Sequence, residues 1–174
     1  MDVFSRTFLP AAAETGLAVQ TASRHMPVFR QCVGSGDATI LVARCSRPDR
    51  PVAGEYLLLL THRRMVVTQQ TRVLHRLRLH LNTELRELSN VTWSPDPRSQ
   101  SVELAATAID GVRERFVVHT QHPKQVWQLD TLLHHAFRTR LRPAKERVVA
   151  TIGETPATAD PGLRPVPAVD RILT

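Results

Sequence analysis

Short runs of apolar and β-forming residues, some of them alternating with polar residues, fill the chain from Ala38 to Thr120, and turn-forming residues separate them. A period of two predicts half-buried β-strands, because successive side chains of a strand point to opposite faces. The predicted strands are Ala38–Cys45, Glu55–Thr61, Met65–Gln70, Arg72–Leu81, Leu88–Ser94, Val102–Ile109 and Arg113–Thr120. This order predicts a small, closed, antiparallel β-unit.

The fourth predicted strand shows the clearest alternation. Its odd positions are mostly apolar and its even positions mostly cationic, in the sequence Arg72, Val73, Leu74, His75, Arg76, Leu77, Arg78, Leu79, His80, Leu81. We therefore expect a half-buried strand whose outer face is basic. The tight turn before the third strand adds Arg63 and Arg64 to the basic residues of this region.

A single amphipathic helix is predicted after the strands, at Pro123–Arg138. Proline suits the first turn of a helix, since its missing N–H is not needed there. An apolar stripe at helical spacing follows, and Trp127 widens it: Val126, Leu129, Leu132, Leu133, Ala136 and Phe137. We expect this stripe to cover one open end of the sheet.

Two further zones flank the β-unit, so the predicted organisation is 1–36, 37–138 and 139–174. In the first zone the apolar spacing suits a helix interrupted near Pro10 and Gly16. This predicted helix ends either before Pro27 or at the turn 34–36. It either docks on the core of its own chain or binds a partner. The last zone begins basic and becomes rich in proline, so it is predicted to be largely disordered.

The charge of the chain is strongly positive. The 23 Lys and Arg against 16 Asp and Glu give a formal net charge of +7, which fits either a nucleic-acid footprint or a solvated basic surface. Nearly all of the positive charge is arginine, with Lys124 and Lys145 as the lysines. Aromatic residues make up only 5% of the chain, which argues against binding of single-stranded nucleic acid by base stacking.

Motifs for catalysis or metal binding are weak. His119 and His122 straddle a turn, and the neighbours His134 and His135 point about 100° apart on a helix, so neither pair has metal-ligand spacing. The sequence contains no Gly-x-Ser-x-Gly elbow and no glycine-rich phosphate loop. We expect a non-catalytic protein without a cofactor.

The cysteines and the N-terminal residues indicate the cellular compartment of the protein. Cys32 and Cys45 are the only thiols; a bridge between them is possible, but two free thiols in a reducing compartment are the simpler expectation. The first residues lack the basic start and long apolar stretch of a signal peptide, and no run is long enough for a membrane span. The sequence therefore predicts a cytoplasmic protein.

Seven strands followed by one helix is the element order of pleckstrin-homology-like (PH-like) domains, and the local sequence resembles them too. Glu55–Thr68 resembles the hairpin of bacterial PH-like and GRAM-like domains, in which a strand, a threonine, an Arg-Arg turn and an apolar strand follow one another. Leu85–Val91 resembles the step into their middle strand, and Pro123–Phe137 their closing helix. The resemblance implies a mainly β, seven-stranded antiparallel barrel or sandwich capped by a helix, here with an N-terminal helical extension.

The resemblance also implies a binding role. Similar domains bind phosphoinositides, peptides or other proteins, and phosphoinositide binders use basic residues between the first two strands. Here the corresponding loop, Ser46–Gly54, is charge-balanced, with Arg47 and Arg50 beside Asp49 and Glu55, and makes a poor phosphate cradle.

The main functional hypothesis is docking of an acidic protein partner or assembly through the basic strand face. Nucleic-acid or ribosome-associated binding and binding to anionic lipid are the alternatives. The oligomeric state stays open. The candidate partner-binding residues are Arg63, Arg64, Arg72, Arg76, Arg78, His80, Arg140 and Arg142.

Overall fold

The computed structural model describes residues 2–50 and 54–138 of the 174-residue chain. All described residues belong to one compact unit. The prediction of a disordered tail at 139–174 lies outside the described residues.

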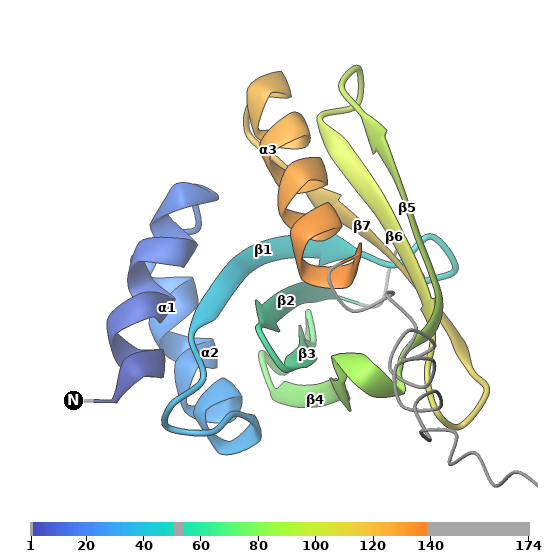
Figure 1. The fold of residues 1–174 in the computed structure, drawn as a ribbon. Coiled ribbons are helices and arrows are strands. Elements are labelled where there is room, and N and C mark those ends of the chain that lie inside the picture. The colour runs from blue at the N-terminus through green and yellow to red at the C-terminus, as the bar shows by residue number, and fades with distance from the viewer. Residues whose placement is uncertain (1, 51–53, 139–174) are drawn as a thin grey trace, which may run out of the picture. The chain divides into compact units, whose positions relative to one another are not determined.

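Seven antiparallel strands form one bent sheet in the order β4-β3-β2-β1-β7-β6-β5 (Figure 1). The strands are β1 (Thr39–Ser46), β2 (Glu55–Thr61), β3 (Arg64–Gln70), β4 (Leu77–Glu84), β5 (Ser89–Asp96), β6 (Ser101–Thr107) and β7 (Arg113–His119). Every strand pairs with at least one neighbour in sequence, and β1 also pairs with β7, at Cys45 and Val118, so that β4 and β5 form the two edges of the order. All seven predicted strands are present, and the second matches its predicted bounds.

The hairpin of β2 and β3 runs through the middle of the molecule and is buried on both faces. Leu58 and Leu60 belong to the core inside the bent sheet, whereas Leu57 and Leu59 belong to a second core on its outer face. A strand covered on both sides reads as a continuous apolar run, and Tyr56–Leu60 is such a run.

The fourth strand differs from its prediction. Strand β4 begins at Leu77, so Arg72 and Arg76 lie in the β3–β4 loop. A bulge places His80 between Leu79 and Leu81, which pair with the consecutive residues Thr68 and Val67. One extra residue exchanges the faces of a strand. The prediction of one strand over Arg72–Leu81 with a mostly cationic outer face is therefore wrong in its bounds and in the residues that share a face.

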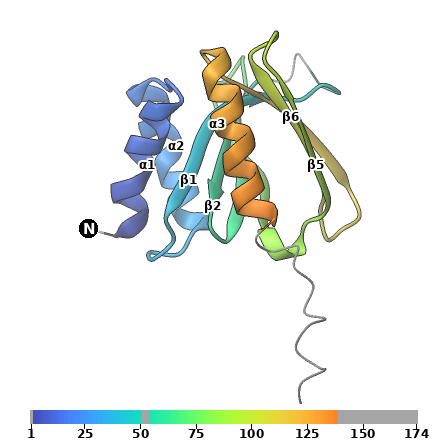
Figure 2. The same ribbon diagram turned by 45° about the horizontal axis from the view of Figure 1, so that its top comes forward.

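The closing helix consists of α3 (Pro123–Leu133) and a π-helical turn, η2 (His134–Arg138), and lies across the concave side of the bent sheet (Figure 2). The apolar stripe is buried as expected, and it contacts β5 and β6. The indole Nε1 of Trp93, on β5, donates a hydrogen bond to Asp130 at 2.8 Å. Trp127 does not belong to the buried stripe; it is 55% exposed, because it lies on the solvent side of the helix.

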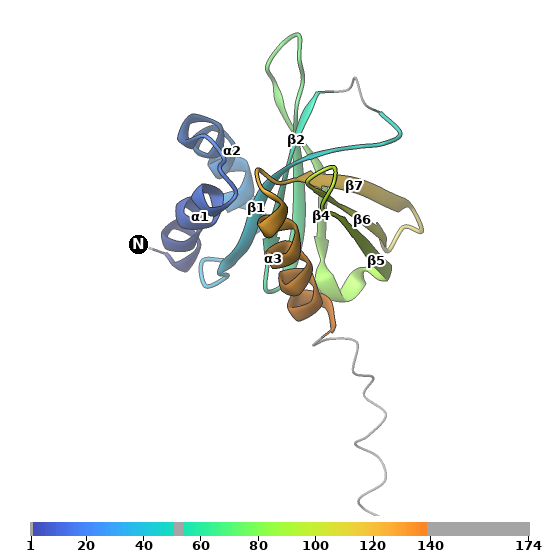
Figure 3. The same ribbon diagram turned by 90° about the horizontal axis from the view of Figure 1, so that it is seen from above.

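Two N-terminal helices cover the outer face of β1–β3 (Figures 1 and 3). They are α1 (Val3–Glu14) and α2 (Val19–Cys32), and the chain turns between them at Gly16, whose φ is +68°. Pro10 and Pro27 lie inside the helices and end neither of them. Both prolines are exposed, so water can satisfy the carbonyl groups that lose an N–H partner.

The N-terminal helices dock on their own sheet through a cluster of phenylalanines. Phe4, Phe8 and Phe29 are at most 1% exposed and pack against Val42 and Leu59 of the sheet. Of the two alternatives left open by the sequence, the structure has this segment docked on the core of its own chain.

His25 is a polar residue inside this interface between α2 and β3. It is fully buried, its Nδ1 lies 2.7 Å from Oγ1 of Thr68, and its Nε2 has no hydrogen-bond partner among the described residues. Burial lowers the pKa of His25 below its usual range, the positive charge of Arg24 adds to this, and Gln70 and Glu55 oppose it. The neutral ring is therefore the form that fits the docked helix.

We expect the free energy of unfolding to fall as the pH is lowered through about 6.5, the pKa of histidine in an unfolded chain. The unfolded state binds the proton first, because the pKa of His25 is lower in the folded state. Chemical denaturation at pH 7.5 and pH 5.5 measures the loss. A His25→Phe variant, which has no proton to bind there, should lose less over the same interval. An equal loss in both proteins would contradict this role for His25.

Candidate functional site

The structure divides the predicted basic residues between the two ends of β3. Arg63 lies in the β2–β3 turn and Arg64 begins β3, whereas Arg72, Arg76 and Arg78 lie in or beside the β3–β4 loop. The seven residues of β3 separate the two groups by about 20 Å at ~3.3 Å per residue. They cannot form one surface. Arg140 and Arg142 lie outside the described residues.

His80 takes no part in an exposed basic face. Its ring lies between the rings of Tyr56 and Phe116, at centroid distances of 5.5 Å and 6.0 Å. Arg47, which belongs to the charge-balanced loop between the first two strands, donates to Nε2 of His80 and forms an ion pair with Glu114 at 3.0 Å. Arg47 also pairs with Asp49 at 2.8 Å, so its charge is used within the protein.

The β3–β4 loop projects beyond the sheet, beside the described part of the β1–β2 connection (Figure 3). Thr71 closes it by donating its backbone N–H to the carbonyl of Arg76 at 3.0 Å, and His75 adopts a φ of +46°. Val73 and Leu74 form its tip and are 89% and 65% exposed. The loop therefore presents apolar side chains to solvent on a fixed hairpin.

Arginines surround this apolar tip. Arg72 and Arg76 flank it in the loop and Arg78 follows in β4; all three are exposed. Their guanidinium groups form no hydrogen bond or ion pair with a described residue. Arg72 also lines a cavity of about 630 Å³ together with Arg24 of α2 and Arg44 of β1. This end of the sheet thus combines unpaired positive charge with exposed apolar surface.

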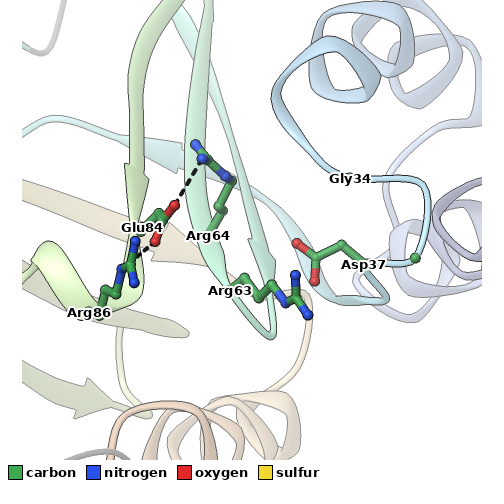
Figure 4. Close-up of a pocket in the computed structure, with 7 residues that line it drawn as sticks. Gly34, Asp37, Arg63, Arg64, Glu84 and Arg86 are labelled. Carbon is green, nitrogen blue, oxygen red and sulfur yellow. Dashed lines mark hydrogen bonds and ion pairs between the residues drawn. The ribbon is translucent and has the colours of Figure 1, made fainter.

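A second cavity, of about 590 Å³, lies at the opposite end of β3 (Figure 4). Three segments line it: the α2–β1 connection with Gly34, Gly36 and Asp37, the β2–β3 turn, and the end of β4 with the short 3₁₀ helix η1 (Leu85–Glu87). Glu84 binds two arginines there, Arg64 at 3.2 Å and Arg86 at 2.5 Å. The guanidinium group of Arg63 has no partner among the described residues.

Sequence reasoning found part of each cluster. It named the arginines of the loop and the turn, but it missed Asp37, Glu84 and Arg86 as lining residues, because three distant segments bring them together. The Gly34-Ser35-Gly36-Asp37 turn was a usable signal, since it adjoins the predicted first strand. It also missed the apolar tip, because Val73 was assigned to a buried strand face.

The described residues offer little for catalysis. They contain no group of three or more His, Cys, Asp and Glu that could hold a metal ion. Cys32 and Cys45 are free, and burial raises the pKa of both thiols, so neither is an activated nucleophile. No helix in the described ranges is long and apolar enough to cross a membrane.

Several solved structures are similar to this chain at low sequence identity. The DH/PH domains of PDZ-RhoGEF, in complex with activated RhoA, match 78% of this chain and 35% of theirs, with 14% identity and a TM-score of 0.42. The DH/PH domains of p115-RhoGEF match 80% of this chain and 40% of theirs, with 12% identity and a TM-score of 0.47. This chain therefore spans less than half the length of either RhoGEF chain.

A bacterial structure is also similar. The pleckstrin homology domain from Shewanella amazonensis SB2B matches over 69% of this chain and 97% of its own, with 15% identity and a TM-score of 0.40. No protein-family model matches the chain, and no curated protein matches it.

The fold is PH-like, as the order of its own elements shows. Seven antiparallel strands follow one another in a single bent sheet, and a C-terminal helix packs on its concave side. The N-terminal helix pair is an addition to this plan.

Proposed function

We propose that this protein is an interaction module that associates with anionic membrane surfaces through its β3–β4 loop. The observation that carries the proposal is the exposure of Val73 and Leu74, 89% and 65%, at the tip of a projecting hairpin. Exposure of two adjacent apolar side chains to water is unfavourable, whereas their insertion into the apolar region below lipid headgroups is favourable.

The surrounding arginines complement this insertion. Each Arg near an anionic leaflet contributes about 1 kcal/mol of attraction, provided that its charge is not already paired. Arg72, Arg76 and Arg78 meet this condition among the described residues. The cavity beside the tip, which Arg72 shares with Arg24, gives a phosphorylated headgroup a place; Arg44 also lines it but is paired with Glu55 at 3.0 Å.

The β6–β7 turn lies beyond the end of β1, because β7 runs antiparallel to β1 and the last residue of β1, Ser46, pairs with Val117 near the end of β7. It carries two further exposed apolar residues, Ile109 at 78% and Val112 at 49%. The hypothesis of docking through one basic strand face is replaced, since Arg72 and Arg76 lie in the loop and Arg78 alone of these three lies in β4.

We expect the full chain to float with vesicles that contain acidic lipid and to stay behind with vesicles of phosphatidylcholine alone. The double variant Val73→Ser/Leu74→Ser should weaken binding at least about tenfold, because it removes the inserting surface. The pair Arg72→Gln/Arg76→Gln should weaken it by about 2 kcal/mol, or roughly thirtyfold, and most strongly at low salt.

Leu9→Ser is the matched control, because Leu9 is an exposed apolar residue of α1 (41%) that lies away from the loop. Its recovery with acidic vesicles should equal that of the unmodified protein. Equal recovery of the unmodified protein with acidic and neutral vesicles would refute the proposal. Binding that survives loss of the apolar tip would limit the site to electrostatic attraction.

A further inference from the structure

We propose that the cavity at the opposite end of β3 is a second binding site, which holds an acidic peptide segment of a partner protein. Its ligand would contact Arg63 and Arg86 through carboxylates and Asp37 through an N–H group. The proposal is independent of membrane binding, because the two sites lie about 20 Å apart along the strand.

The walls of this cavity are fixed before any ligand arrives. The hydroxyl of Thr61, fully buried, accepts the backbone N–H groups of Arg63 and Arg64 at 3.2 Å and 2.9 Å and donates to Asp37 at 2.8 Å. The backbone N–H of Leu85 donates to the carbonyl of Arg63 at 2.7 Å. These bonds tie the turn to the two neighbouring segments, so a ligand meets a preorganised site.

The charges of the cavity are unequally satisfied. Three arginines face two carboxylates, and the single carboxylate of Glu84 forms ion pairs with both Arg64 and Arg86. Arg64 is held further by Asn82 at 3.0 Å, whereas Arg86 is largely exposed and keeps free donors. Arg63 has no partner among the described residues. The lining therefore offers one unused guanidinium group and part of a second, which suits carboxylates.

Asp37 distinguishes a peptide from a simple anion. Its side chain and that of Arg63 point toward one another without forming an ion pair (Figure 4). A phosphate ion that bound Arg63 would lie beside this carboxylate and be repelled by it. An acidic residue within a peptide carries both a carboxylate for Arg63 and a backbone N–H for Asp37. The absence of side chains at Gly34 and Gly36 leaves room for a main chain along this wall.

The test is a titration of the ¹⁵N-labelled full chain with capped hexaglutamate at low salt, followed by amide chemical shifts. We expect saturable shifts at Gly34, Gly36 and Arg63. Arg63→Gln should weaken binding about tenfold, because it removes a charge-assisted contact. Arg76→Gln, which removes the same charge at the other end of β3, should leave the affinity unchanged.

Other outcomes would overturn the proposal. Equal weakening by Arg63→Gln and Arg76→Gln would show general electrostatic attraction, and the absence of shifts at these amides would show that the peptide does not bind there. Inorganic phosphate that shifts the same amides at the same concentration would assign the cavity to simple oxyanions. If Arg63→Gln fails to give a folded spectrum, Arg86→Gln takes its place, with the same tenfold loss expected. Vesicle flotation of Arg63→Gln should stay unchanged, so that failure of one proposal leaves the other testable.

Discussion

Replacement of Phe8 by alanine is expected to lower the free energy of unfolding by about 3–5 kcal/mol. Phe8 is fully buried, and its ring lies between those of Phe4 and Phe29 at centroid distances of 5.2 Å and 5.8 Å. The three rings join α1 and α2 to the outer face of the sheet. The alanine would leave a cavity in the middle of this interface that rigid strands cannot close.

Urea denaturation followed by circular dichroism measures this loss. Leu9→Ala is the control, since the neighbouring side chain on the same helix is 41% exposed and its loss should cost no more than about 1 kcal/mol. A cost below about 1 kcal/mol for Phe8→Ala would mean that the N-terminal helices are not docked on the sheet in solution.

Replacement of Leu133 by alanine is expected to cost about 2–5 kcal/mol, because α3 closes the inner core. Leu133 is 1% exposed and belongs to the core cluster with Val126 and Leu58. Trp127→Ala on the same helix should cost distinctly less, although tryptophan is the larger residue, because its side chain is 55% exposed.

The same denaturation experiment compares the two variants of α3. The order of the two losses is the critical result. If Trp127→Ala were the more damaging change, α3 would lie on the sheet with a different face from the one described, and the closing role of Leu133 would be wrong.

The sequence predicted those parts of the fold in which local pattern and tertiary packing agree. The β2–β3 hairpin was predicted almost to the residue, because its strands are apolar throughout and the turn between them is polar. The β4 strand was placed too early, because the alternation of arginine and leucine continues through a loop. Nothing local marks the bulge at His80, which depends on the register with β3.

The candidate sites were less predictable than the fold. An arginine can be recognised from sequence, but whether its charge is free depends on carboxylates from other segments. Arg47 and Arg78 look equivalent along the chain, yet Arg47 is bound by Asp49 and Glu114, whereas Arg78 has no such partner among the described residues. The exposure of Val73 likewise follows from the position of a turn, which hydrophobicity alone misjudges.

The distribution of aromatic residues makes the two cores optically distinct. Both tryptophans, Trp93 and Trp127, report on the closing helix, and the indole of Trp93 is bonded to it. The N-terminal helices contain phenylalanine but no tryptophan or tyrosine. Their release from the sheet is therefore silent in tryptophan emission but visible in far-ultraviolet circular dichroism. Coincident transitions by both probes would show that the added helix pair and the PH-like body unfold as one cooperative unit.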